Sequence, residues 1–456
     1  MIKKGLIIIY PVEKNKKYTV EITAVSSEGS GIAKIDGYTL FVPDTVDGDV
    51  CEILVVKTKS SYGYGKLMKV ISPSENRTTP PCPHFAKCGG CQLMSMDYAH
   101  QLEFKKTAVH DALSRIGGVD TEPDIIGMDE PFRYRNKMIF PIDKNGNWGF
   151  YRERSHDVIP LEDCLLGGEI NKEIMNTVCD YMKKAGVSAY DEKSHKGIIR
   201  RVFIRNGANE IMVVISANAD SLKNSDYLVD ELKSLSPKIS SIILNVNKKQ
   251  TNLVLGDKNI TLFGKDEIVG TISGLDYEIS PHSFFQINPI QTEKLYAKAI
   301  EYAEIGKDDT VMDIYCGIGT ISLTAAKKAK NVIGVEIVPQ AIENAKKNAK
   351  DNGFDNAEFY CSAAEDIVPT LIKDGNTPDI VILDPPRKGS DEKTLSAIVS
   401  ANPKRIVYVS CNPATLARDV NFLTENGYRL TKTTAVDMFP HTTHVETVVL
   451  LQRQNT

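Results

Sequence analysis

The chain contains no apolar run long enough to span a membrane. None of its 456 residues lies in a run approaching the roughly 18 apolar residues that a membrane helix requires. The apolar stretch 5–12 is too short for a signal sequence, and no small-residue cleavage site follows it. We therefore expect a cytoplasmic protein with no membrane partner.

The chain also has little net charge. It carries 55 basic and 59 acidic residues, a formal net charge of −4, so the total charge does not indicate a nucleic-acid partner. The lysines are nevertheless unevenly spread, because the first 17 residues contain five lysines and one acid. A second group follows at Lys57, Lys59, Lys66 and Lys69. Local basic patches matter more for RNA contact than total charge, so these lysines are either an RNA-binding patch or an ordinary solvated surface.

Disulfide bonds are not expected either. The nine cysteines are an odd number, and a cytosolic chain of this size rarely has a disulfide framework. Three of them, Cys82, Cys88 and Cys91, lie within ten residues, and Cys164 follows later in the chain. Four thiolates can hold zinc or a 4Fe–4S cluster. The spacing alone leaves zinc, an iron–sulfur cluster and no metal as alternatives.

The patterning predicts three domains. Residues 1–72 contain short β-forming runs separated by Gly, Asp and Ser turns, which is typical of a small barrel of the OB type or of an unspecialised β domain. The expected strands are 18–24, 32–35, 39–42, 49–56 and 64–70. Residues 73–291 begin with a Pro- and Ser-rich joint and a helix over about 97–116, and then mix strands with short helices as an α+β domain. From 292 to 456 helices and strands alternate, which predicts a doubly wound parallel sheet.

A glycine-rich turn follows the first expected strand of the last domain. Residues 311–319 are an apolar strand that runs into Gly317-Ile318-Gly319, where the backbone can approach a ligand closely. Glu336 ends the next strand, where an acid can accept hydrogen bonds from a ribose diol. Together these features resemble an S-adenosylmethionine methyltransferase, with a nicotinamide enzyme as the alternative. Taken alone, Glu336 is equally consistent with a solvated acid.

Two further strand ends carry reactive groups. The apolar strand 379–383 runs into Asp384-Pro385-Pro386-Arg387, and the strand 405–410 runs into Cys411. Functional residues of open α/β sheets gather at the carboxyl ends of strands. We therefore expect Asp384 to face a cofactor or base and Arg387 to hold a carbonyl or phosphate. A lone cysteine is usually a small core residue, but the position of Cys411 predicts a nucleophile.

Methylation of uracil at carbon 5 requires a nucleophile of this kind. Attack of a thiolate on carbon 6 makes carbon 5 electron-rich, so that carbon 5 can take a methyl group from a sulfonium. A base must then remove the proton from carbon 5 before the thiolate is expelled. Glu446, at the start of the last apolar strand, is the candidate base, and a strand-edge charge is the alternative.

Three motifs then identify a family. Asp-Pro-Pro-Arg-Lys-Gly at 384–389 is followed by Val-Ser-Cys-Asn-Pro-Ala-Thr-Leu-Ala-Arg-Asp at 409–419 and by His-Val-Glu-Thr-Val at 444–448. With them the chain closely resembles the RNA uracil-5-methyltransferase family over essentially its whole length. The resemblance implies a multidomain α/β protein with a C-terminal Rossmann-like methyltransferase domain. It also implies Cys411 as nucleophile, Glu446 as base, and contacts to S-adenosylmethionine at Gln286, Tyr315, Glu336 and Asp384.

The N-terminal half resembles one branch of this family. The string Cys-Pro-His-Phe-Ala-Lys-Cys-Gly-Gly-Cys-Gln at 82–92 resembles the iron–sulfur site of members that act on ribosomal RNA, and the barrel resembles the RNA-binding TRAM domain. Members that act on transfer RNA typically lack both features. The resemblance therefore implies 23S ribosomal RNA as substrate and a structural 4Fe–4S cluster in the central domain, held by Cys82, Cys88, Cys91 and Cys164.

Other functions remain as alternatives. A transfer RNA uracil-5-methyltransferase would use the same chemistry on another RNA. An RNA cytosine-5-methyltransferase typically carries a second active-site cysteine, and none lies near Cys411 in the sequence. A non-catalytic RNA-binding iron–sulfur sensor would not need Cys411, Glu446 and Asp384 together. We expect a monomer.

Overall fold

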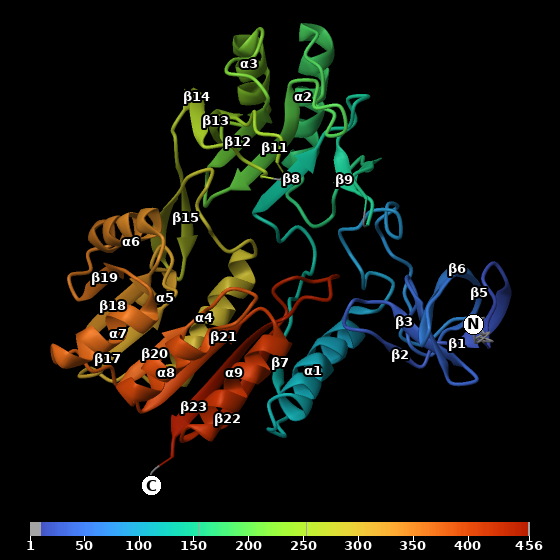
Figure 1. Cartoon of the computed structure of the whole chain (residues 1–456). Helices are drawn as coiled ribbons and strands as arrows, with labels where there is room; N and C mark the ends of the chain where they lie inside the picture. The colour runs from blue at the N-terminus through green and yellow to red at the C-terminus, as the bar shows by residue number, and fades with distance from the viewer. Residues whose placement is uncertain (1–10, 154, 252, 455–456) are drawn as a thin grey trace, which may run out of the picture. The chain divides into compact units, whose positions relative to one another are not determined.

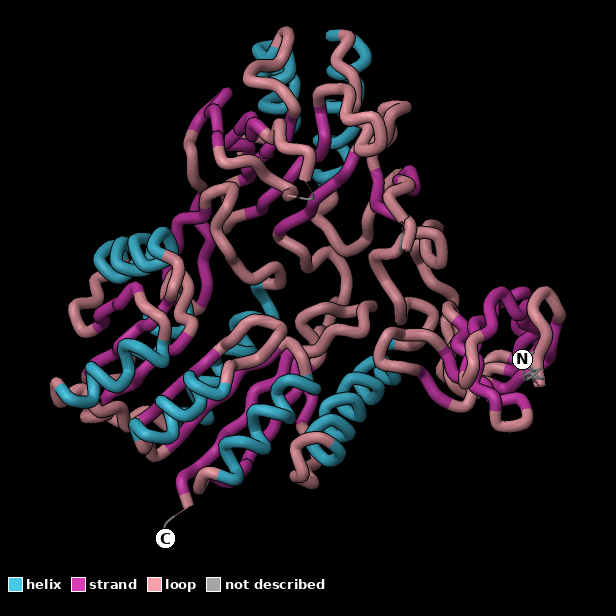
Figure 2. The backbone as a smooth tube through the Cα atoms, viewed as in Figure 1, coloured by secondary structure: helices cyan, strands magenta, loops and turns pink. Residues whose placement is uncertain are grey.

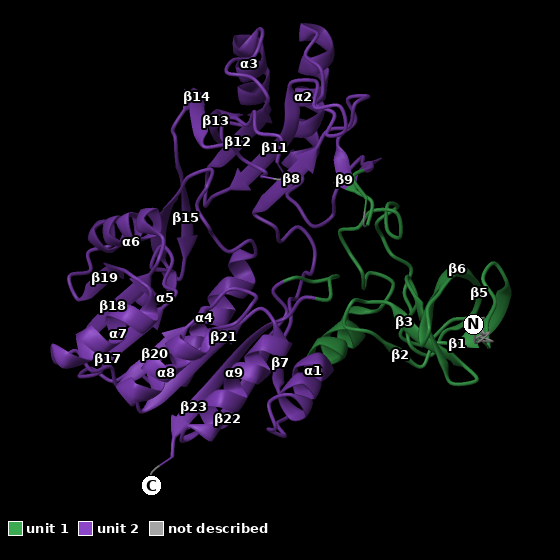
Figure 3. Cartoon of the chain, viewed as in Figure 1, with its two compact units in different colours: residues 1–105, 151–156, 439–443 green, residues 106–150, 157–438, 444–456 purple. Residues whose placement is uncertain are grey.

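A computed structural model describes residues 11–153, 155–251 and 253–454 (Figure 1). The chain divides into two compact units (Figure 3). Unit 1 comprises residues 1–105, 151–156 and 439–443, and unit 2 comprises residues 106–150, 157–438 and 444–456. Lys3, Lys4 and residues 5–10 of the apolar stretch 5–12 lie outside the described residues. Among the helices that are described, none is long and apolar enough to cross a membrane.

Unit 1 contains a six-stranded sheet in the order β1-β5-β6-β4-β3-β2. Its neighbouring strands are antiparallel except for β4 and β6, which are parallel. The small β domain expected from the sequence is present, with one extra two-residue strand. The strands are β1 (Lys17–Glu21), β2 (Ala24–Val25), β3 (Gly31–Ile35), β4 (Tyr38–Val42), β5 (Val50–Thr58) and β6 (Tyr62–Ser72).

Alternation along the strands builds the core of this sheet. In β5 the side chains of Cys51, Ile53 and Val55 are fully buried, and their neighbours are at least partly exposed. Successive side chains of a strand point to opposite faces, so a period of two places one face in the core. Val20, Ile22, Leu40 and Val42 complete that core.

Unit 2 contains a five-stranded sheet in the order β14-β13-β12-β11-β8. One of its faces packs on two amphipathic helices, since Val178 and Leu228 share a core with Met138, Phe140 and neighbouring strand residues. Figure 2 shows both helices beside this sheet. The elements are β8 (Lys137–Pro141), α2 (Ile170–Ala185), β11 (Ile199–Asn206), β12 (Ile211–Ala217), α3 (Ser225–Leu235), β13 (Ile239–Val246) and β14 (Lys258–Gly264).

Four smaller strands and one long helix lie outside these two sheets. The hairpin of β15 (Ile268–Ile272) and β16 (Leu275–Ile279) comes before the last domain, and β9 (Gly149–Tyr151) pairs with β10 (Val158–Pro160). Helix α1 (Tyr98–Arg115) covers the helix expected over 97–116.

The rest of unit 2 is an eight-stranded sheet in the order β19-β18-β17-β20-β21-β23-β22-β7. The run from β19 to β21 is parallel, and β23 is antiparallel to both of its neighbours. The strands are β7 (Asp124–Ile126), β17 (Thr310–Ile314), β18 (Asn331–Glu336), β19 (Ala357–Cys361), β20 (Ile380–Leu383), β21 (Arg405–Ser410), β22 (Tyr428–Val436) and β23 (Glu446–Arg453). The helices are α4 (Pro289–Ala303), α5 (Thr320–Ala326), α6 (Pro339–Asp351), α7 (Ala364–Lys373), α8 (Glu392–Ala401) and α9 (Pro413–Glu425).

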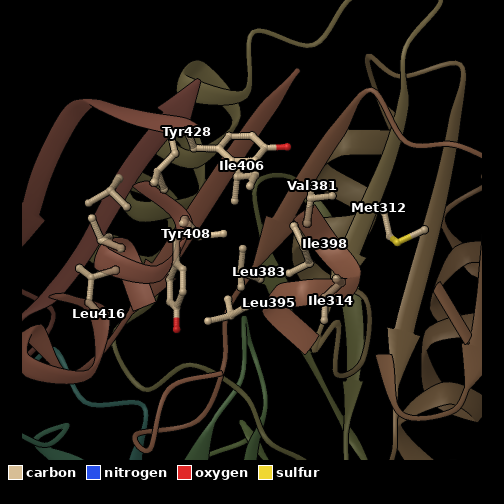
Figure 4. Close-up of a cluster of buried hydrophobic side chains, with 14 of the residues drawn as sticks. Met312, Ile314, Val381, Leu383, Leu395, Ile398, Ile406, Tyr408, Leu416 and Tyr428 are labelled. Atoms are coloured by element: carbon tan, nitrogen blue, oxygen red, sulfur yellow. The ribbon is translucent and has the colours of Figure 1, made fainter. Parts of the chain in front are cut away.

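Continuous apolar strands explain why this sheet is covered on both faces. All four residues of β20 are buried, as parallel strands between two helical layers require. Side chains from α1, α7, α8 and α9 pack on one face in a single cluster, part of which Figure 4 draws around Tyr408 and Leu383. The doubly wound domain expected from the sequence is therefore present.

Candidate active site at the strand ends of the eight-stranded sheet

Five of the expected site residues lie at one edge of the eight-stranded sheet. Glu336 ends β18, and Tyr315, Asp384 and Cys411 directly follow β17, β20 and β21. These four strands are neighbours in the order β18-β17-β20-β21, and β23, which begins with Glu446, comes next. The sheet thus gathers in one row residues that are up to 131 positions apart in the sequence.

Hydrogen bonds from two turns, one after β17 and one after β18, hold the side chain of Glu336. Its carboxylate accepts hydrogen bonds from the backbone N–H groups of Gly317, Ile337 and Val338, at 3.3, 2.9 and 3.0 Å. Gly317 has a positive φ of 55°, and a Cβ placed there would meet no atom within 4 Å. A glycine at this position leaves open space beside the carboxylate, so a ligand can approach the backbone closely.

Tyr315 sits at the same turn in a conformation that is uncommon for a tyrosine. Its φ is 68°, in the left-handed region that non-glycine residues seldom adopt. The backbone N–H of Tyr315 donates to Val335 O at 2.9 Å, and its hydroxyl lies 3.1 Å from Ser390 Oγ. The backbone and the hydroxyl group of Tyr315 are therefore both fixed by hydrogen bonds, and its ring is half-buried. Together with Glu336, this turn fits a ligand that carries a ribose and a flat base.

The acids behind the turn are held away from water. Burial raises the pKa of Asp384 to about 7. Burial also raises the pKa of Asp313 to about 7, with the charges of Asp384 and Glu336 acting in the same direction and the Ser322 hydrogen bond opposing them. Ser322 donates to one carboxylate oxygen of Asp313 at 2.5 Å, and the other oxygen has no hydrogen-bond partner in the described part of the chain. Two acids therefore lie close together in this part of the site, and burial disfavours the charged form of both.

Gln286 reaches this site from the irregular segment before α4. It is 9% exposed, and its side chain is hydrogen-bonded to Tyr296 of α4. The Tyr296 hydroxyl also lies 3.0 Å from Thr320 Oγ1, at the start of α5. Burial and then the charge of Asp384 raise the pKa of Tyr296 far above its usual range. Gln286, Tyr296 and Thr320 therefore form one hydrogen-bonded group near Asp384.

Cys411 and Glu446 face each other across two hydrogen-bonded strands. The antiparallel register of β21 and β23 pairs Ser410 with Thr447, and one further step places Cys411 opposite Glu446. Residues directly opposite in such a pair have Cβ atoms about 4.5–5.5 Å apart. This register brings the expected nucleophile and the expected base together.

The electrostatics of this pair follow from its burial. Glu446 is 5% exposed, and burial together with the Asp384 charge raises its pKa well above the usual value. Burial, and then the charges of Glu446 and Asp384, raise the pKa of Cys411 to about 11. The positive charge of Arg387 opposes both shifts. Burial therefore favours the neutral forms of both the thiol and the carboxyl.

The loop that carries Arg387 is tied to the loop after Cys411. Arg387 O accepts hydrogen bonds from Asn412 Nδ2 at 3.1 Å and Thr415 Oγ1 at 3.2 Å. The exposed Arg387 guanidinium lies 3.4 Å from His444 Nε2. The backbone of Arg387 is therefore fixed by the neighbouring loop, and its guanidinium is exposed beside His444.

Buried Asp419 supports the same loop from below. It accepts hydrogen bonds from the Tyr408 hydroxyl at 2.5 Å and from Ser390 N at 2.8 Å. Gly389 has a φ of 77°, and a Cβ there would lie 2.6 Å from both the Asp419 carboxylate and the Arg418 guanidinium. Glycine is therefore required at this turn.

The two phenylalanines before Gln286 have different environments. Phe285 is 4% exposed and packs against the ring of Tyr277, whereas Phe284 is 70% exposed. Phe285 belongs to the core, and Phe284 presents a full aromatic face next to the site.

The structure gives the four-cysteine site no support. Across residues 11–153, 155–251 and 253–454, no group of three or more His, Cys, Asp or Glu side chains could hold a metal ion. Cys82, Cys88 and Cys91 belong to unit 1 and Cys164 to unit 2. None of the nine cysteines forms a disulfide in the described part of the chain.

Comparisons with known proteins identify the family of the chain. The family model described as tRNA (Uracil-5-)-methyltransferase matches residues 97–454, and that of the TRAM domain matches residues 11–68. An uncharacterized RNA methyltransferase of Clostridium tetani is 46% identical over 447 residues, which are 97% of each chain. Another from Halalkalibacterium halodurans is 44% identical over 452 residues, covering 98% of this chain and 99% of that one.

One solved structure matches almost the whole chain. It is the tRNA (uracil-54, C5)-methyltransferase of Pyrococcus abyssi in complex with S-adenosyl-L-homocysteine, with a TM-score of 0.78 and 29% sequence identity. The match covers 95% of this chain and 99% of that protein. The uncovered 5% is shorter than the TRAM match, so the similarity extends into the N-terminal sheet.

Proposed function

The chain belongs to the S-adenosylmethionine-dependent RNA uracil-5-methyltransferase family, and from this premise we propose that it methylates carbon 5 of a specific uridine in 23S ribosomal RNA. The observation that supports the proposed chemistry is the pairing of Ser410 with Thr447, the neighbours of Cys411 and Glu446, together with the effect of the Glu446 charge on the Cys411 thiol. Without that register the thiol and the carboxyl could not act on adjacent atoms of one ring.

The two side chains divide the work on the uracil. The Cys411 thiolate adds to carbon 6, and the new C–S bond leaves carbon 5 able to attack the methyl group. Glu446 then takes the proton from carbon 5, the ring double bond re-forms, and the C–S bond breaks to regenerate the thiolate. Arg387, on the loop after β20, would stabilise negative charge on the uracil carbonyl in the adduct.

The cofactor residues hold the methyl donor beside this pair. S-adenosylmethionine supplies the methyl group and, until transfer, the positive charge of its sulfonium. Glu336 would bind the ribose, Tyr315 would pack on the adenosine, and Asp384 with Gln286 would hold the end nearest the sulfonium. A positive charge there lowers the pKa of the surrounding acids, so Cys411 ionises more readily once the site is filled. After transfer that charge is gone, and Glu446 has regained the proton affinity that a base needs.

The barrel offers a surface suited to unpaired bases. Phe41, Tyr62 and Tyr64 are half-buried, and their ring centroids lie 5.8–6.1 Å apart. The register that pairs Phe41 with Tyr64 puts these rings on one face of β4 and β6, close to Lys57 opposite Tyr64 on β5. Aromatic rings flanked by lysines bind single-stranded nucleic acid through stacking and phosphate contacts. This surface supports RNA as the partner of the TRAM domain.

The barrel does not by itself favour ribosomal over transfer RNA. The structural match to the Pyrococcus abyssi transfer RNA enzyme extends into this domain, so a TRAM-like sheet is compatible with either substrate. The proposal of 23S ribosomal RNA therefore depends on the cysteine string 82–92 and its resemblance to members that act on ribosomal RNA. Transfer RNA remains the second candidate because a solved relative acts on it.

A direct assay separates these substrates. Total 23S ribosomal RNA and transfer RNA from a strain without this gene would each be incubated with the protein and methyl-labelled S-adenosylmethionine. We expect 5-methyluridine in 23S ribosomal RNA at one or two positions that mass mapping identifies. Label confined to transfer RNA would overturn the ribosomal assignment, and label on cytosine would overturn the uracil chemistry.

We also propose that Cys82, Cys88, Cys91 and Cys164 hold a 4Fe–4S cluster with a structural role. The support is the number and type of donors, since four thiolates suit this cluster, and the family resemblance of the string. Protein purified without oxygen should then carry about four irons and four sulfides per chain. Stoichiometric zinc, or no metal at all, would contradict the proposal.

A further inference from the structure

Three cations lie together on the face of the five-stranded sheet that α2 and α3 do not cover. Lys137 on β8 is directly opposite Arg205 on β11 in an antiparallel pair, so the two side chains share a face. Their neighbours Met138 and Ile204 point to the other face and pack on the helices. Arg135 precedes Lys137 by two residues.

No carboxylate neutralises these three charges. Within the described residues, none of Arg135, Lys137 and Arg205 forms an ion pair, although neighbouring arginines do. Arg133 binds Asp163 at 2.5 Å and Arg200 binds Glu192 at 2.9 Å. Arg201, on the same face of β11 as Arg205, pairs with Glu192 at 3.4 Å, so the unpaired cations are confined to the end of this face near Lys137.

One of the three cations is buried and the other two are half-buried. Arg205 is 5% exposed, and Arg135 and Lys137 are half-buried. The Nε atoms of Arg135 and Arg205, like those of the ion-paired Arg200 and Arg201, have no hydrogen-bond partner in the described chain. Burial, with the charges of Arg205 and Arg135, lowers the pKa of Lys137 to about 8. Burial and Arg205 likewise lower the pKa of nearby His282. Buried like charges without a counterion destabilise a fold, so the arrangement indicates a place for an anion.

This cluster is connected to the active site through the backbone. Arg205 donates to Pro281 O at 3.1 Å and to Ser283 O at 2.7 Å. Asn136, between Arg135 and Lys137, donates from Nδ2 to Gln286 O at 2.9 Å. The same cationic strands therefore hold the segment that carries exposed Phe284 and cofactor-facing Gln286. An anion bound here would lie beside the 281–286 segment, which leads to the active site.

We propose that Arg135, Lys137 and Arg205 bind one backbone phosphodiester of the substrate RNA beside the target uridine. Two guanidinium groups supply planar paired donors and Lys137 supplies a point charge, a combination that suits phosphate oxygens. Arg205 uses one nitrogen of its guanidinium to fix the 281–283 backbone, and its Nε has no hydrogen-bond partner in the described chain. The inference rests on the proposed RNA substrate.

The test measures how RNA affinity depends on salt. Each phosphate contact adds about 0.7 to the slope of log affinity against log salt for single-stranded RNA. We expect Lys137→Gln to reduce the magnitude of this slope by about 0.7, the value for one contact, and to weaken binding about tenfold at low salt. Lys137→Arg should keep the wild-type slope. Lys183→Gln, on α2 and ion-paired with Asp180, is the matched control and should change neither quantity.

Three outcomes would overturn the phosphodiester assignment. Lys137→Gln could keep the full slope, or Lys137→Arg could lose it, which would indicate packing rather than charge. Inorganic phosphate could raise the melting temperature of the wild type but not that of Lys137→Gln, while both proteins show the same salt slope for RNA. That result would indicate a site for a free anion. S-adenosylmethionine affinity of each variant checks the fold. If the wild type methylates no uridine, the proposed function fails instead; if it does and Lys137→Gln binds RNA normally, only this inference fails.

Discussion

The two sheets of unit 2 bury opposite charges. At the strand ends of the eight-stranded sheet, Asp313, Asp384 and Glu446 are acids whose pKa values burial raises. On one face of the five-stranded sheet, Lys137 and Arg205 are cations whose pKa values burial lowers. Neither set finds a full complement of opposite charge among the described residues. Arg133 and Arg200 each form an ion pair with a carboxylate, whereas these two sets of charges are uncompensated.

The missing countercharge in each sheet matches a ligand. The acidic set is suited to the positive sulfonium of the methyl donor, and the cationic set is suited to a phosphate of the acceptor RNA. A buried charge without a partner costs several kcal/mol, and that cost is recovered when a ligand of the opposite sign binds. The sign of the uncompensated charge thus indicates which half of the reaction each sheet serves.

The largest expected effect separates the two catalytic groups at the acidic edge. Cys411→Ala should lower turnover by about 10⁴-fold or more, because no other group can add to carbon 6. Glu446→Gln should permit attack and methyl transfer but stall release. A denaturing gel with methyl-labelled cofactor should therefore show no covalent RNA complex with the first variant and a labelled complex with the second.

Cys361→Ser is the matched control for the thiol. Cys361 ends β19, at the other end of the parallel run from β21, and its loss should leave adduct formation intact. Normal turnover by Glu446→Gln would show that another group removes the proton. Methylation by Cys411→Ala would rule out the covalent mechanism.

The next effect tests whether the acidic set serves a positive ligand. Asp384→Asn should weaken S-adenosylmethionine binding about 10- to 100-fold, since it removes a buried negative charge near the sulfonium. It should weaken binding of neutral S-adenosylhomocysteine only a few-fold. Calorimetric titration of both ligands measures the difference, and an equal loss for the two would show that Asp384 acts by shape or hydrogen bonding alone.

Removing either uncompensated charge should stabilise the protein without ligands. We expect Asp384→Asn and Lys137→Met each to raise the free energy of unfolding by about 1–3 kcal/mol at the pH where the lost group is charged. Thermal unfolding without cofactor or RNA measures this. A fall in stability for both variants would mean that each charge has a partner in the folded state.

The pH dependence of these gains should have opposite sign. The pKa of Asp384 rises from 3.8 to about 7 on folding, so ionisation costs stability increasingly between pH 4 and 7 and fully above that range. Asp384→Asn should therefore gain more at pH 8 than at pH 5. The pKa of Lys137 falls from 10.5 to about 8, so its charge costs most below pH 8 and the cost fades towards pH 10.5. Lys137→Met should gain more at pH 6 than at pH 9.5.

The smallest effect comes from a carboxylate outside both sets. Asp391 caps α8, and its Oδ1 accepts a hydrogen bond from Thr394 N at 2.9 Å. Asp391→Ala should destabilise the fold by about 1 kcal/mol, with the same loss at pH 6 and pH 8. It should leave both ligand affinities unchanged. A gain in stability here would show that the gains at Asp384 and Lys137 have no special cause.

The active-site edge could be predicted from the sequence because each residue follows an apolar strand. Glu336, Asp384 and Cys411 all come directly after such a run, and the carboxyl ends of parallel strands meet at one edge. Asp313 was missed, although an acid inside the apolar run 311–314 is a visible signal of a buried functional group. Gln286 came only from the family resemblance, since it lies in an irregular segment without periodicity.

Other residues left no local signal. Tyr296 lies on a helix, and only its contact with Thr320 and Gln286 reveals a role. The pairing of Lys137 with Arg205 depends on the register of strands 68 residues apart, which neither sequence alone specifies. The opposition of Cys411 and Glu446 depends likewise on the antiparallel insertion of β23 between β21 and β22. These features could not be predicted because they depend on the pairing of strands that are far apart in the sequence, and not on a local pattern.

That insertion has a consequence for motion. Cys411 and Glu446 lie at the end of a ladder whose strands are buried along most of their length, and such ladders open only when much of the domain unfolds. Their amides should be among those that exchange slowest with deuterium. The nucleophile and the base are then already assembled before any substrate arrives, so we expect movement of the RNA into place and of product out of it to set the timing of turnover.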